Sequence, residues 1–445
     1  MPTLNQTSEL SPSDALSVLK KHMLVDGFPI VLDLEACHGC YLHDSLSDKE
    51  YLDFYSFFAS MPIGYNHPRM RTPEFRARLV EAGTIKVANP DIYTLFLAEF
   101  VRTFDSIAGL VGLDRLFFID GGALAVENAL KAAFDWKVRK NLAAGRGEIG
   151  SGVIHFQQAF HGRSGYTLSL TNTHDPRKTM YFPQFDWPRI DNPKIDFSLD
   201  EPRRTKDVER REQQALEQIS RAIDERGHDL AAIIIEPIQG EGGDNHFRAE
   251  FLTALRQVCD QHEMLLIFDE VQTGIGLTGK MWCCEHFGVM PDIIAFGKKT
   301  QVCGIMAGPR LDEVDSVFKV SSRINSTFGG NLVDMVRAGE YLRIIRDEKL
   351  VDRAAAAGRH LLDGLTELAG QHDVMSAVRG RGLMCAFDLP SEAVRDAVRQ
   401  DCYERGMLVL TCGERSIRFR PVLDIDDGDL DAGLAILDQS LTSLA

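Results

Sequence analysis

The sequence has no long apolar run and no excess of positive charge, and each absence excludes a class of protein. No stretch approaches the roughly 20 consecutive apolar residues of a membrane-spanning helix. The polar N-terminus, Met1–Lys21, lacks the apolar segment of a secretory signal, so we expect a cytoplasmic protein. The formal net charge of -16 argues against a surface for nucleic acid or anionic membrane. We therefore expect neither as a partner.

Cysteine and histidine are present but lack the spacing of a disulfide framework or a metal site. The nine cysteines are an odd number scattered over 445 residues. Cys37 and Cys40 form a lone CxxC, and no second pair is spaced to complete a zinc site. We interpret the cysteines as reduced structural thiols. The histidines show no ligand spacing and no HExxH, so we expect no metal.

Strand-like apolar runs alternate with helical patterns between about residues 61 and 330. The expected strands are Leu116–Asp120, Gly152–Phe156, Ala231–Glu236, and the two runs Leu265–Gln272 and Pro291–Lys299. The expected helices are Asp91–Leu110, Ala125–Lys140, Val208–Arg226 and Glu250–His262. Alternation of this kind predicts an α/β fold with a mostly parallel central sheet and helices on both faces.

The two ends of the chain predict a smaller α+β domain. Residues 1–60 hold a helix-like start and strand-like runs at Ile30–Leu34 and Tyr51–Tyr55. Residues 331–445 hold two helical patterns, several strand-like runs and a final amphipathic helix, Leu430–Ser443. We expect residues 1–60 to join the C-terminal small domain, and 61–330 to form the large domain.

An acid and a lysine follow two expected strands of the large domain. The first strand delivers Asp269 and Glu270 to its C-terminal end, and the second delivers Lys298 and Lys299. Because parallel strands end at one edge of a sheet, carboxylate and amine are expected to face one pocket. This is the requirement of a pyridoxal phosphate enzyme, in which the lysine forms a Schiff base and the acid pairs with the pyridinium nitrogen.

Glycine-rich turns offer candidate phosphate sites. The turn Gly121-Gly122-Ala123 lies between a strand and a helix, where free N–H groups converge on an anion, although a plain tight turn explains it equally. Gly274–Lys280 fits both G-x-G-x-x-G and G-x-x-x-x-G-K, so a dinucleotide-binding or P-loop protein is the alternative from another class. Met281 stands where a P-loop needs Ser or Thr, and neither pattern follows its strand directly.

Charged residues at other strand ends leave several chemistries open. Phe160 and Arg163 follow one strand and offer an aromatic face and a guanidinium. Glu236 and Glu241 could suggest a glycosidase, but nothing fixes their separation. The segment Arg418-Phe-Arg420 places two arginines on one face of a strand, one of them a candidate anion ligand.

Three motifs, in order and at the right spacing, resemble those of class III aminotransferases of fold type I, which use pyridoxal 5'-phosphate. They are Glu236-Pro-Ile-Gln-Gly-Glu-Gly-Gly243, Leu266-Ile-Phe-Asp-Glu-Val-Gln-Thr-Gly274 and Pro291-Asp-Ile-Ile-Ala-Phe-Gly-Lys298. The resemblance covers nearly the whole chain. It implies the fold of that family and an active site completed by a homodimer.

The resemblance also implies roles for residues at the cofactor. Lys298 would carry the Schiff base and Asp269 would hold the ring nitrogen protonated. The remaining cofactor contacts would come from the ring-binding and phosphate-binding residues Gly122, Ala123, Phe160, Gln272 and, from the neighbouring subunit, Thr327. Many relatives have hydroxyl residues at the turn where this chain has Gly121-Gly122-Ala123.

Within the family, three sequence segments resemble those of members that act on L-lysine: Gly121–Trp136, His161–Asn172 and Phe296–Gly304. Those members move the terminal amine of L-lysine to 2-oxoglutarate, giving glutamate and a semialdehyde that cyclises. Ornithine and 4-aminobutyrate are the alternative donors.

That resemblance implies four substrate contacts. Arg163 would bind the carboxylate far from the reacting carbon, and Asn325 would help to position lysine. Arg420 would bind the α-carboxylate of glutamate, and Glu241 would neutralise Arg420 when lysine is bound, since an unpaired buried guanidinium is costly.

Overall fold

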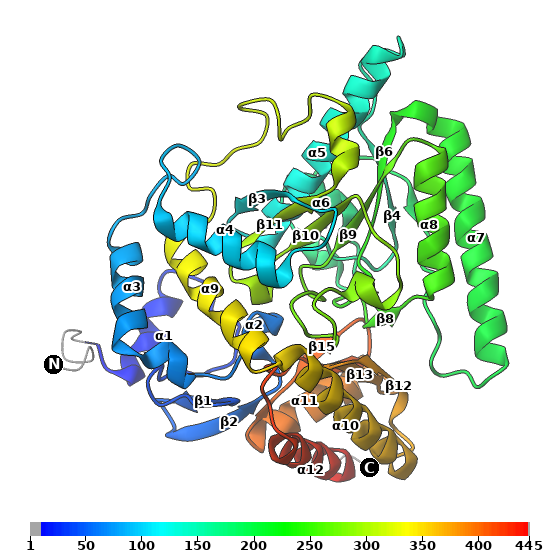
Figure 1. Cartoon of the computed structure of the whole chain (residues 1–445). Coiled ribbons are helices and arrows are strands. Elements are labelled where there is room, and N and C mark those ends of the chain that lie inside the picture. The colour runs from blue at the N-terminus through cyan, green and yellow to red at the C-terminus, as the bar shows by residue number, and fades with distance from the viewer. Residues whose placement is uncertain (1–9, 444–445) are drawn as a thin grey trace.

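A seven-stranded sheet lies at the centre of the computed structural model, which describes residues 10–443 (Figure 1). Its strands lie in the order β3-β11-β10-β9-β6-β4-β5. Their bounds are β3 Arg115–Ile119, β4 Gly152–Phe156, β5 Arg189–Ile190, β6 Leu230–Ile235, β9 Leu265–Asp269, β10 Ile293–Phe296 and β11 Cys303–Ala307. β11 is antiparallel to both of its neighbours, and the other pairings are parallel. The expected α/β fold with a mostly parallel sheet is confirmed.

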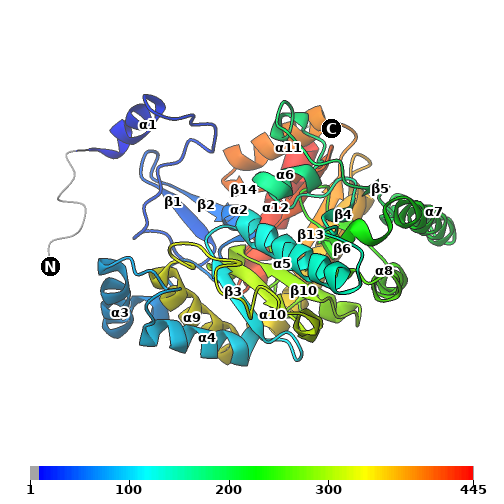
Figure 2. The same ribbon diagram turned by 90° about the horizontal axis from the view of Figure 1, so that it is seen from above.

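Both faces of this sheet are buried, which explains its near-continuous apolar strands. Ile233 and Ile294 point into one hydrophobic core, while Ile234 and Ile293 point into another. The long helix α5, Gly122–Ala143, covers the second core, and α4, α7 and α8 cover the first (Figures 1 and 2). Their bounds are α4 Leu95–Ala108, α7 Arg203–Arg226 and α8 Ala249–Gln261.

Two smaller sheets join segments from the two ends of the chain. One sheet has the order β1-β2-β14, with β1 Tyr41–Asp44 and β2 Lys49–Asp53 from the N-terminal part and β14 Met407–Leu408 from the C-terminal part. The other has the order β12-β13-β16-β15, with bounds Ser376–Arg381, Met384–Asp388, Ser416–Phe419 and Leu410–Cys412 respectively. Parallel pairing of β14 with β2 thus connects the two ends. The division into domains at residues 60 and 330 stays a prediction.

The remaining elements pack around these sheets. The other α-helices are α1 Pro12–Lys20, α2 Ser56–Ala59, α3 Pro73–Thr84, α6 Gly165–Leu170, α9 Leu332–Asp347, α10 Leu350–Gln371, α11 Glu392–Glu404 and α12 Asp427–Ser443. The hairpin β7 Ile238–Gln239 and β8 Asn245–His246 encloses the loop that holds Glu241. α9 packs against α3 and α4, while α10 and α11 pack against α12.

Some expected elements differ from the observed ones. The expected strand Ile30–Leu34 is wrong, because only Leu32 forms an isolated bridge, to Asp44. β11 was not expected, since its sequence contains Gly304, a residue that weakens strands. A side chain at Gly304 would meet the carbonyl oxygen of Phe117 at 2.2 Å, so glycine is required by the close approach of β3.

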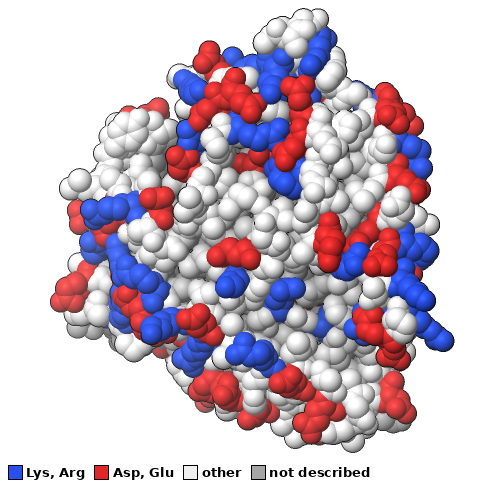
Figure 3. All heavy atoms as spheres, turned by 45° about the vertical axis from the view of Figure 1, so that its right-hand side comes forward, with Lys and Arg blue, Asp and Glu red and all other residues white. Residues whose placement is uncertain are grey.

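The surface carries mixed charge. On the face shown in Figure 3, Lys and Arg lie interspersed with Asp and Glu among the described residues. No helix within residues 10–443 combines the length and apolar character needed to cross a membrane. In the same residues, no three His, Cys, Asp or Glu side chains gather as a metal site would require. All nine cysteines are free thiols. Residues Met1–Glu9 of the segment examined for a secretory signal lie outside the described part of the chain.

Candidate active site

The C-terminal ends of the parallel strands open into a cavity of about 610 Å³. β9 ends at Asp269, and β10 leads into Lys298 by way of Gly297. β9 and β10 are neighbours in parallel register, with Asp269 opposite Ala295. Eight of the predicted site residues line this cavity: Gly122, Ala123, Phe160, Arg163, Glu241, Asp269, Gln272 and Lys298. A volume of this size is typical of a site for a small molecule.

Lys298, and not Lys299, presents its amine to the cavity. The amine of Lys298 makes no hydrogen bond with the described residues, and burial followed by the charge of Arg418 lowers its pKa to about 8. Lys299 is buried and donates to the carbonyl oxygen of Met61 at 2.8 Å, outside the cavity. Burial lowers the pKa of Lys299 to about 7. Only Lys298 is placed to react with a ligand.

Asp269 is held by His161, a residue that the sequence interpretation did not assign. Oδ2 of Asp269 lies 2.7 Å from Nδ1 of His161, and Oδ1 accepts from the backbone N–H of Val271 at 3.0 Å. Although burial acts in the opposite direction, the bond to Asp269 raises the pKa of His161. Glu270, the neighbouring acid, instead accepts bonds outside the cavity from Thr273 and from two backbone N–H groups.

Glu236 also lines the cavity, beneath the turn that carries Phe160. It accepts from the backbone N–H groups of Phe160 at 2.9 Å and Gly240 at 3.1 Å. Burial raises its pKa to about 7. Glu236 therefore orders two backbone segments of the cavity wall, and nothing in its bonding resembles the second carboxylate of a glycosidase.

The first turn of α5 supplies unpaired N–H groups. Its N-cap, Gly121, has φ 100 and no capping side chain, and the N–H groups of Gly122 and Ala123 donate to no described acceptor. A Cβ at Gly122 would meet Val271 at 2.9 Å. One at Gly162, where φ is 124, would meet the Cβ of Ala123 at 2.5 Å. This helix end is suited to an anion such as a phosphate.

Gln272 and Phe160 complete the wall between the strand ends and the helix end. The side-chain oxygen of Gln272 accepts from Nε of Arg420 at 3.1 Å, while its amide nitrogen donates to no described acceptor. A Cβ at Gly240 would meet that oxygen at 2.2 Å, so Gly240 makes room for Gln272. The amide N–H of Gln272 is therefore available to an oxygen in the cavity.

Glu241 lies between two cations in the same cavity. One of its oxygens is 2.6 Å from Nη2 of Arg418, and the other is 2.5 Å from Nζ of Lys178. Both cations line the cavity. Lys178 was assigned no role from the sequence, and Arg418 was one of two arginines of which one was a candidate anion ligand. Burial acts to raise the pKa of Glu241, but Arg418 and then Lys178 lower it below the ordinary value of a glutamate.

The expected pairing of Glu241 with Arg420 is not found. Arg420 is fully buried, does not line the cavity, and forms an ion pair with Asp244. Both arginines follow the alternation of β16, as expected. Asp244, three residues after Glu241, provides a fully buried carboxylate for Arg420, so that Arg418 is left for Glu241.

Three further predicted contacts lie at the edge of the site or away from it. Arg163 is exposed at the cavity rim and makes no hydrogen bond or ion pair with the described residues. Asn325 and Thr327 are exposed in the loop before α9, and neither lines the cavity of its own chain. One chain therefore brings Arg163 to the site without Asn325 or Thr327.

Two aromatic residues of the cavity wall were missed. Phe57 and Phe58 belong to a turn, Ser56–Ala59, in which all four residues have positive φ. The hydroxyl of Ser56 donates to the carbonyl oxygen of Arg420 at 2.5 Å, which ties this turn to the end of β16. A run of left-handed residues without glycine has no sequence signature, so its position could not be predicted.

The loop Gly274–Lys280 is not a nucleotide site. Most of its residues are buried, and no α-helix follows it directly. A Cβ at Gly279 would meet Ala355 at 2.8 Å, and one at Gly276 would meet Leu423 at 3.1 Å. Close packing against the C-terminal part explains these glycines, and the dinucleotide and P-loop interpretations are wrong.

Comparison with known proteins gives one consistent result. The family model described as "Aminotransferase class-III" matches residues 24–441. An L-lysine-epsilon aminotransferase of Mycobacterium tuberculosis is 51% identical, with 97% of this chain and 96% of that protein covered. One of Amycolatopsis lactamdurans is 49% identical, with 100% and 99% covered. The solved structure of a lysine aminotransferase from M. tuberculosis has a TM-score of 0.95 at 50% identity, covering 98% of this chain and 100% of that chain.

Proposed function

The chain belongs to the class-III aminotransferases, and on this premise we propose that it transfers the terminal amino group of L-lysine to 2-oxoglutarate. The products are glutamate and 2-aminoadipate 6-semialdehyde, which cyclises. The names of the most similar proteins support lysine as the donor. The observation that carries the proposal is the ion pair between Glu241 and Arg418, both of which line the cavity.

Pyridoxal 5'-phosphate is the cofactor of this class, and the cavity fits it. The free amine of Lys298, the unused amide N–H of Gln272 and the open helix end at Gly122 and Ala123 are groups that the aldehyde, ring oxygen and phosphate require. When bound, the cofactor supplies an aldehyde that takes up the amino group and a ring that withdraws electrons from the reacting carbon. We call these residues, with His161 and Asp269, the cofactor end of the cavity.

At the cofactor end, Lys298 transfers protons and Asp269 stabilises positive charge. With a pKa of about 8, the amine of Lys298 is partly neutral near pH 7, so it can remove a proton from the reacting carbon and return it. The carboxylate of Asp269 stabilises a proton on the ring nitrogen. His161 fixes the orientation of Asp269 through their 2.7 Å contact. Phe160 lines the same cavity, where its face would pack on the ring of the bound cofactor.

A second copy of the chain is proposed to complete the site. Thr327 is exposed in one chain and would contact the phosphate bound by its neighbour, while Asn325 would help to position lysine. Large apolar side chains that are more than two-thirds exposed support an extensive contact between copies: Val80, Ile85, Ile92, Tyr93 and Leu95. A molar mass of one chain in solution would contradict the homodimer. A cytoplasmic location stays a prediction.

A second group of cavity residues, which we call the substrate end, must accept two different molecules. It consists of Arg163, Lys178, Glu241 and Arg418. Lysine presents an apolar stem beside its reacting amine, whereas 2-oxoglutarate presents a carboxylate beside its reacting carbonyl. Glu241 neutralises Arg418 when lysine is bound, and moves off when the α-carboxylate of 2-oxoglutarate takes Arg418. Arg163, unpaired at the rim, binds the far carboxylate of both substrates. Phe57 and Phe58 line the path of the apolar stem.

Side-by-side assays with 2-oxoglutarate and lysine, ornithine or 4-aminobutyrate test the proposal. We expect lysine to be consumed with the highest kcat/KM, and the cyclised semialdehyde to appear in equal amount to glutamate. Ready consumption of ornithine or 4-aminobutyrate with little consumption of lysine would contradict lysine as the donor while leaving the aminotransferase class intact.

A further inference from the structure

Lys178 gives the carboxylate of Glu241 a second cation. Lys178 ends the short 3-10 helix Pro176–Lys178. Its Nζ lies 2.5 Å from Oε1 of Glu241, while Arg418 binds Oε2. Its Nζ also lies 3.4 Å from Oγ1 of Thr173 and 5.7 Å from the ring centre of Phe160. Nothing in the transfer reaction described above uses this ammonium group.

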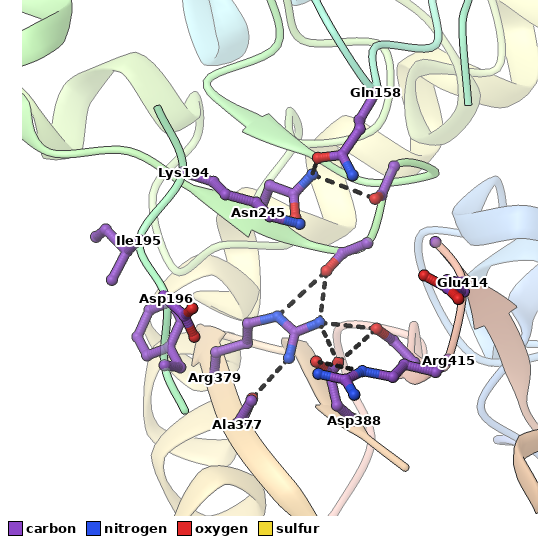
Figure 4. A pocket seen from close by; sticks show the side chains of 15 residues that line it. Gln158, Lys194, Ile195, Asp196, Asn245, Ala377, Arg379, Asp388, Glu414 and Arg415 are labelled. Carbon is purple, nitrogen blue, oxygen red and sulfur yellow. Dashed lines mark hydrogen bonds and ion pairs between the residues drawn. The ribbon is translucent and has the colours of Figure 1, made fainter. Parts of the chain in front are cut away.

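The backbone beside Glu241 is tied down, so the carboxylate can exchange partners only by a movement of its side chain. Gly413 donates its N–H to the carbonyl oxygen of Glu241 at 2.9 Å. Behind the loop, Arg379 lines a small pocket (Figure 4). It donates to the carbonyl oxygens of Gly243 at 2.6 Å and Asp244 at 3.0 Å. Arg379 also bonds Asp388 of β13 at 2.8 Å, which fastens the loop to the C-terminal sheet.

The two cations that bind Glu241 differ in whether a substrate carboxylate can displace Glu241 from them. Arg418 is only 3% exposed, lies at the end of a strand and has a guanidinium suited to a carboxylate. Once the α-carboxylate of 2-oxoglutarate occupies Arg418, the carboxylate of Glu241 would lie beside a second negative charge and be largely shielded from water. Its side chain is 24% exposed, so water alone solvates it incompletely. Lys178 is its one other ion-pair partner in the described chain.

We propose that Lys178 holds Glu241 while 2-oxoglutarate or glutamate occupies Arg418, and so sets the balance between the two substrates. This role rests on the proposed function. In the state with lysine, Glu241 has both cations, and loss of Lys178 leaves Arg418. In the state with 2-oxoglutarate, loss of Lys178 leaves Glu241 with no cation. Removal of Lys178 therefore weakens the binding of dicarboxylates more than the binding of lysine.

The experiment compares Lys178→Met with Lys178→Arg and with the neighbouring control Arg177→Met in the holoenzyme. Arg177 is exposed and paired with Asp175, away from the cavity. We expect Lys178→Met to raise the KM for 2-oxoglutarate and the inhibition constant of glutarate about tenfold, and the KM for lysine less than about twofold. Lys178→Arg should restore most of the loss, and Arg177→Met should behave as the wild type. Equal losses for both substrates would overturn the proposal.

A double-mutant cycle with Glu241→Ala separates an action through Glu241 from direct contact with the ligand. If Lys178 acts through Glu241, Lys178→Met has no further effect on glutarate inhibition once Glu241 is absent. A further tenfold loss in that background would show that Lys178 binds the dicarboxylate itself, and would overturn the proposal. Failure of the wild type to consume lysine would contradict the proposed function instead, because glutarate inhibition of the glutamate reaction can still be measured.

Discussion

The two ends of the cavity are built on different principles. At the cofactor end, Asp269 has one charged partner, His161, and Lys298 has none. Both sit at the ends of neighbouring strands in the middle of the sheet. At the substrate end, Glu241 is shared by Lys178, from a short 3-10 helix, and Arg418, from the C-terminal sheet. This contrast agrees with our proposal that groups which perform one reaction have fixed surroundings, whereas groups that distinguish two substrates have exchangeable partners.

Substitutions at the two ends should therefore have different effects on the two half-reactions. A substitution at the cofactor end removes a group needed with every substrate, so both half-reactions should slow together. A substitution at the substrate end alters the balance of charge, so one substrate should suffer more than the other. The predictions below run from the largest expected effect to the smallest.

Replacement of Lys298 by Ala should give the greatest loss, because the other amine that lines the cavity, that of Lys178, is engaged by Glu241. We expect kcat to fall at least about 10³-fold with lysine and with glutamate alike. Steady-state assays with each donor measure the loss. Borohydride treatment of the wild type should fix the cofactor to the peptide that contains Lys298. A label on Lys299 would show that the assignment is wrong.

Replacement of Arg420 by Met should destabilise the fold rather than change substrate preference. It leaves Asp244, a carboxylate that is only 1% exposed, without its guanidinium. We expect a loss of about 3 to 5 kcal/mol in the free energy of unfolding. Denaturant unfolding of the variant checks the value. A stable Arg420→Met variant with a selectively raised KM for 2-oxoglutarate would return the role of α-carboxylate ligand to Arg420.

Replacement of Arg418 by Met, at the same strand end, should change substrate preference rather than destabilise the fold. It removes the guanidinium expected to bind the α-carboxylate, so the KM for 2-oxoglutarate should rise about 100-fold. Lysine should be affected less, since its apolar stem does not need Arg418. Separate single-turnover measurements with lysine and with 2-oxoglutarate would show this split. Parallel losses with the two substrates would mean that Arg418 has only a structural role.

Replacement of His161 by Ala should slow both half-reactions about 10- to 100-fold. Asp269 would then keep its bond to Val271 but lose the partner that orients its other oxygen. The absorbance of the bound cofactor near neutral pH should also change, since less of the ring nitrogen would be protonated. A variant with an unchanged spectrum and unchanged rates would show that Asp269 needs no support from His161.

The effect of pH on the Glu241 ion pairs should be the smallest. Because Arg418 and Lys178 lower the folded-state pKa of Glu241 despite its burial, the pairs stabilise the fold above the ordinary pKa of about 4.3. That contribution is lost as the pH falls through the lowered value. The difference in Tm between wild type and Glu241→Gln should therefore be constant at pH 6 to 8, roughly, and shrink below about pH 4. A difference that already shrinks at pH 6 would contradict this.

Much of the sheet could be predicted from the sequence, because strands buried on both faces are nearly continuous apolar runs. The same pattern placed Asp269, Glu270, Lys298 and Lys299 at one edge of the sheet, and the choice of Asp269 and Lys298 came from the resemblance to the aminotransferases. β11 could not be predicted, because it contains Gly304. The close approach of the β3 backbone requires glycine there, whereas local strand propensity disfavours it.

Ion pairs between distant segments could not be predicted either, because they too depend on contacts that local sequence does not encode. Whether Glu241 binds Arg418 or Arg420 depends on which arginine Asp244 captures, and alternation along a strand places both on one face. Lys178 lies in a short 3-10 helix whose sequence gives no sign that it reaches Glu241. Local pattern therefore placed the charged groups of two strand ends at one edge of the sheet, but it could not pair Glu241 with Arg418 and Lys178.

The most direct test of the contrast is the Glu241→Ala variant, with the half-reactions of lysine and of glutamate measured separately in single turnovers. Loss of Glu241 leaves Arg418 unneutralised beside the apolar stem of lysine, but leaves it free for the α-carboxylate of glutamate. We predict that the lysine half-reaction slows at least about tenfold more than the glutamate half-reaction. Equal losses in the two half-reactions would contradict the exchange of partners at Glu241, and with it the distinction between the two ends of the cavity.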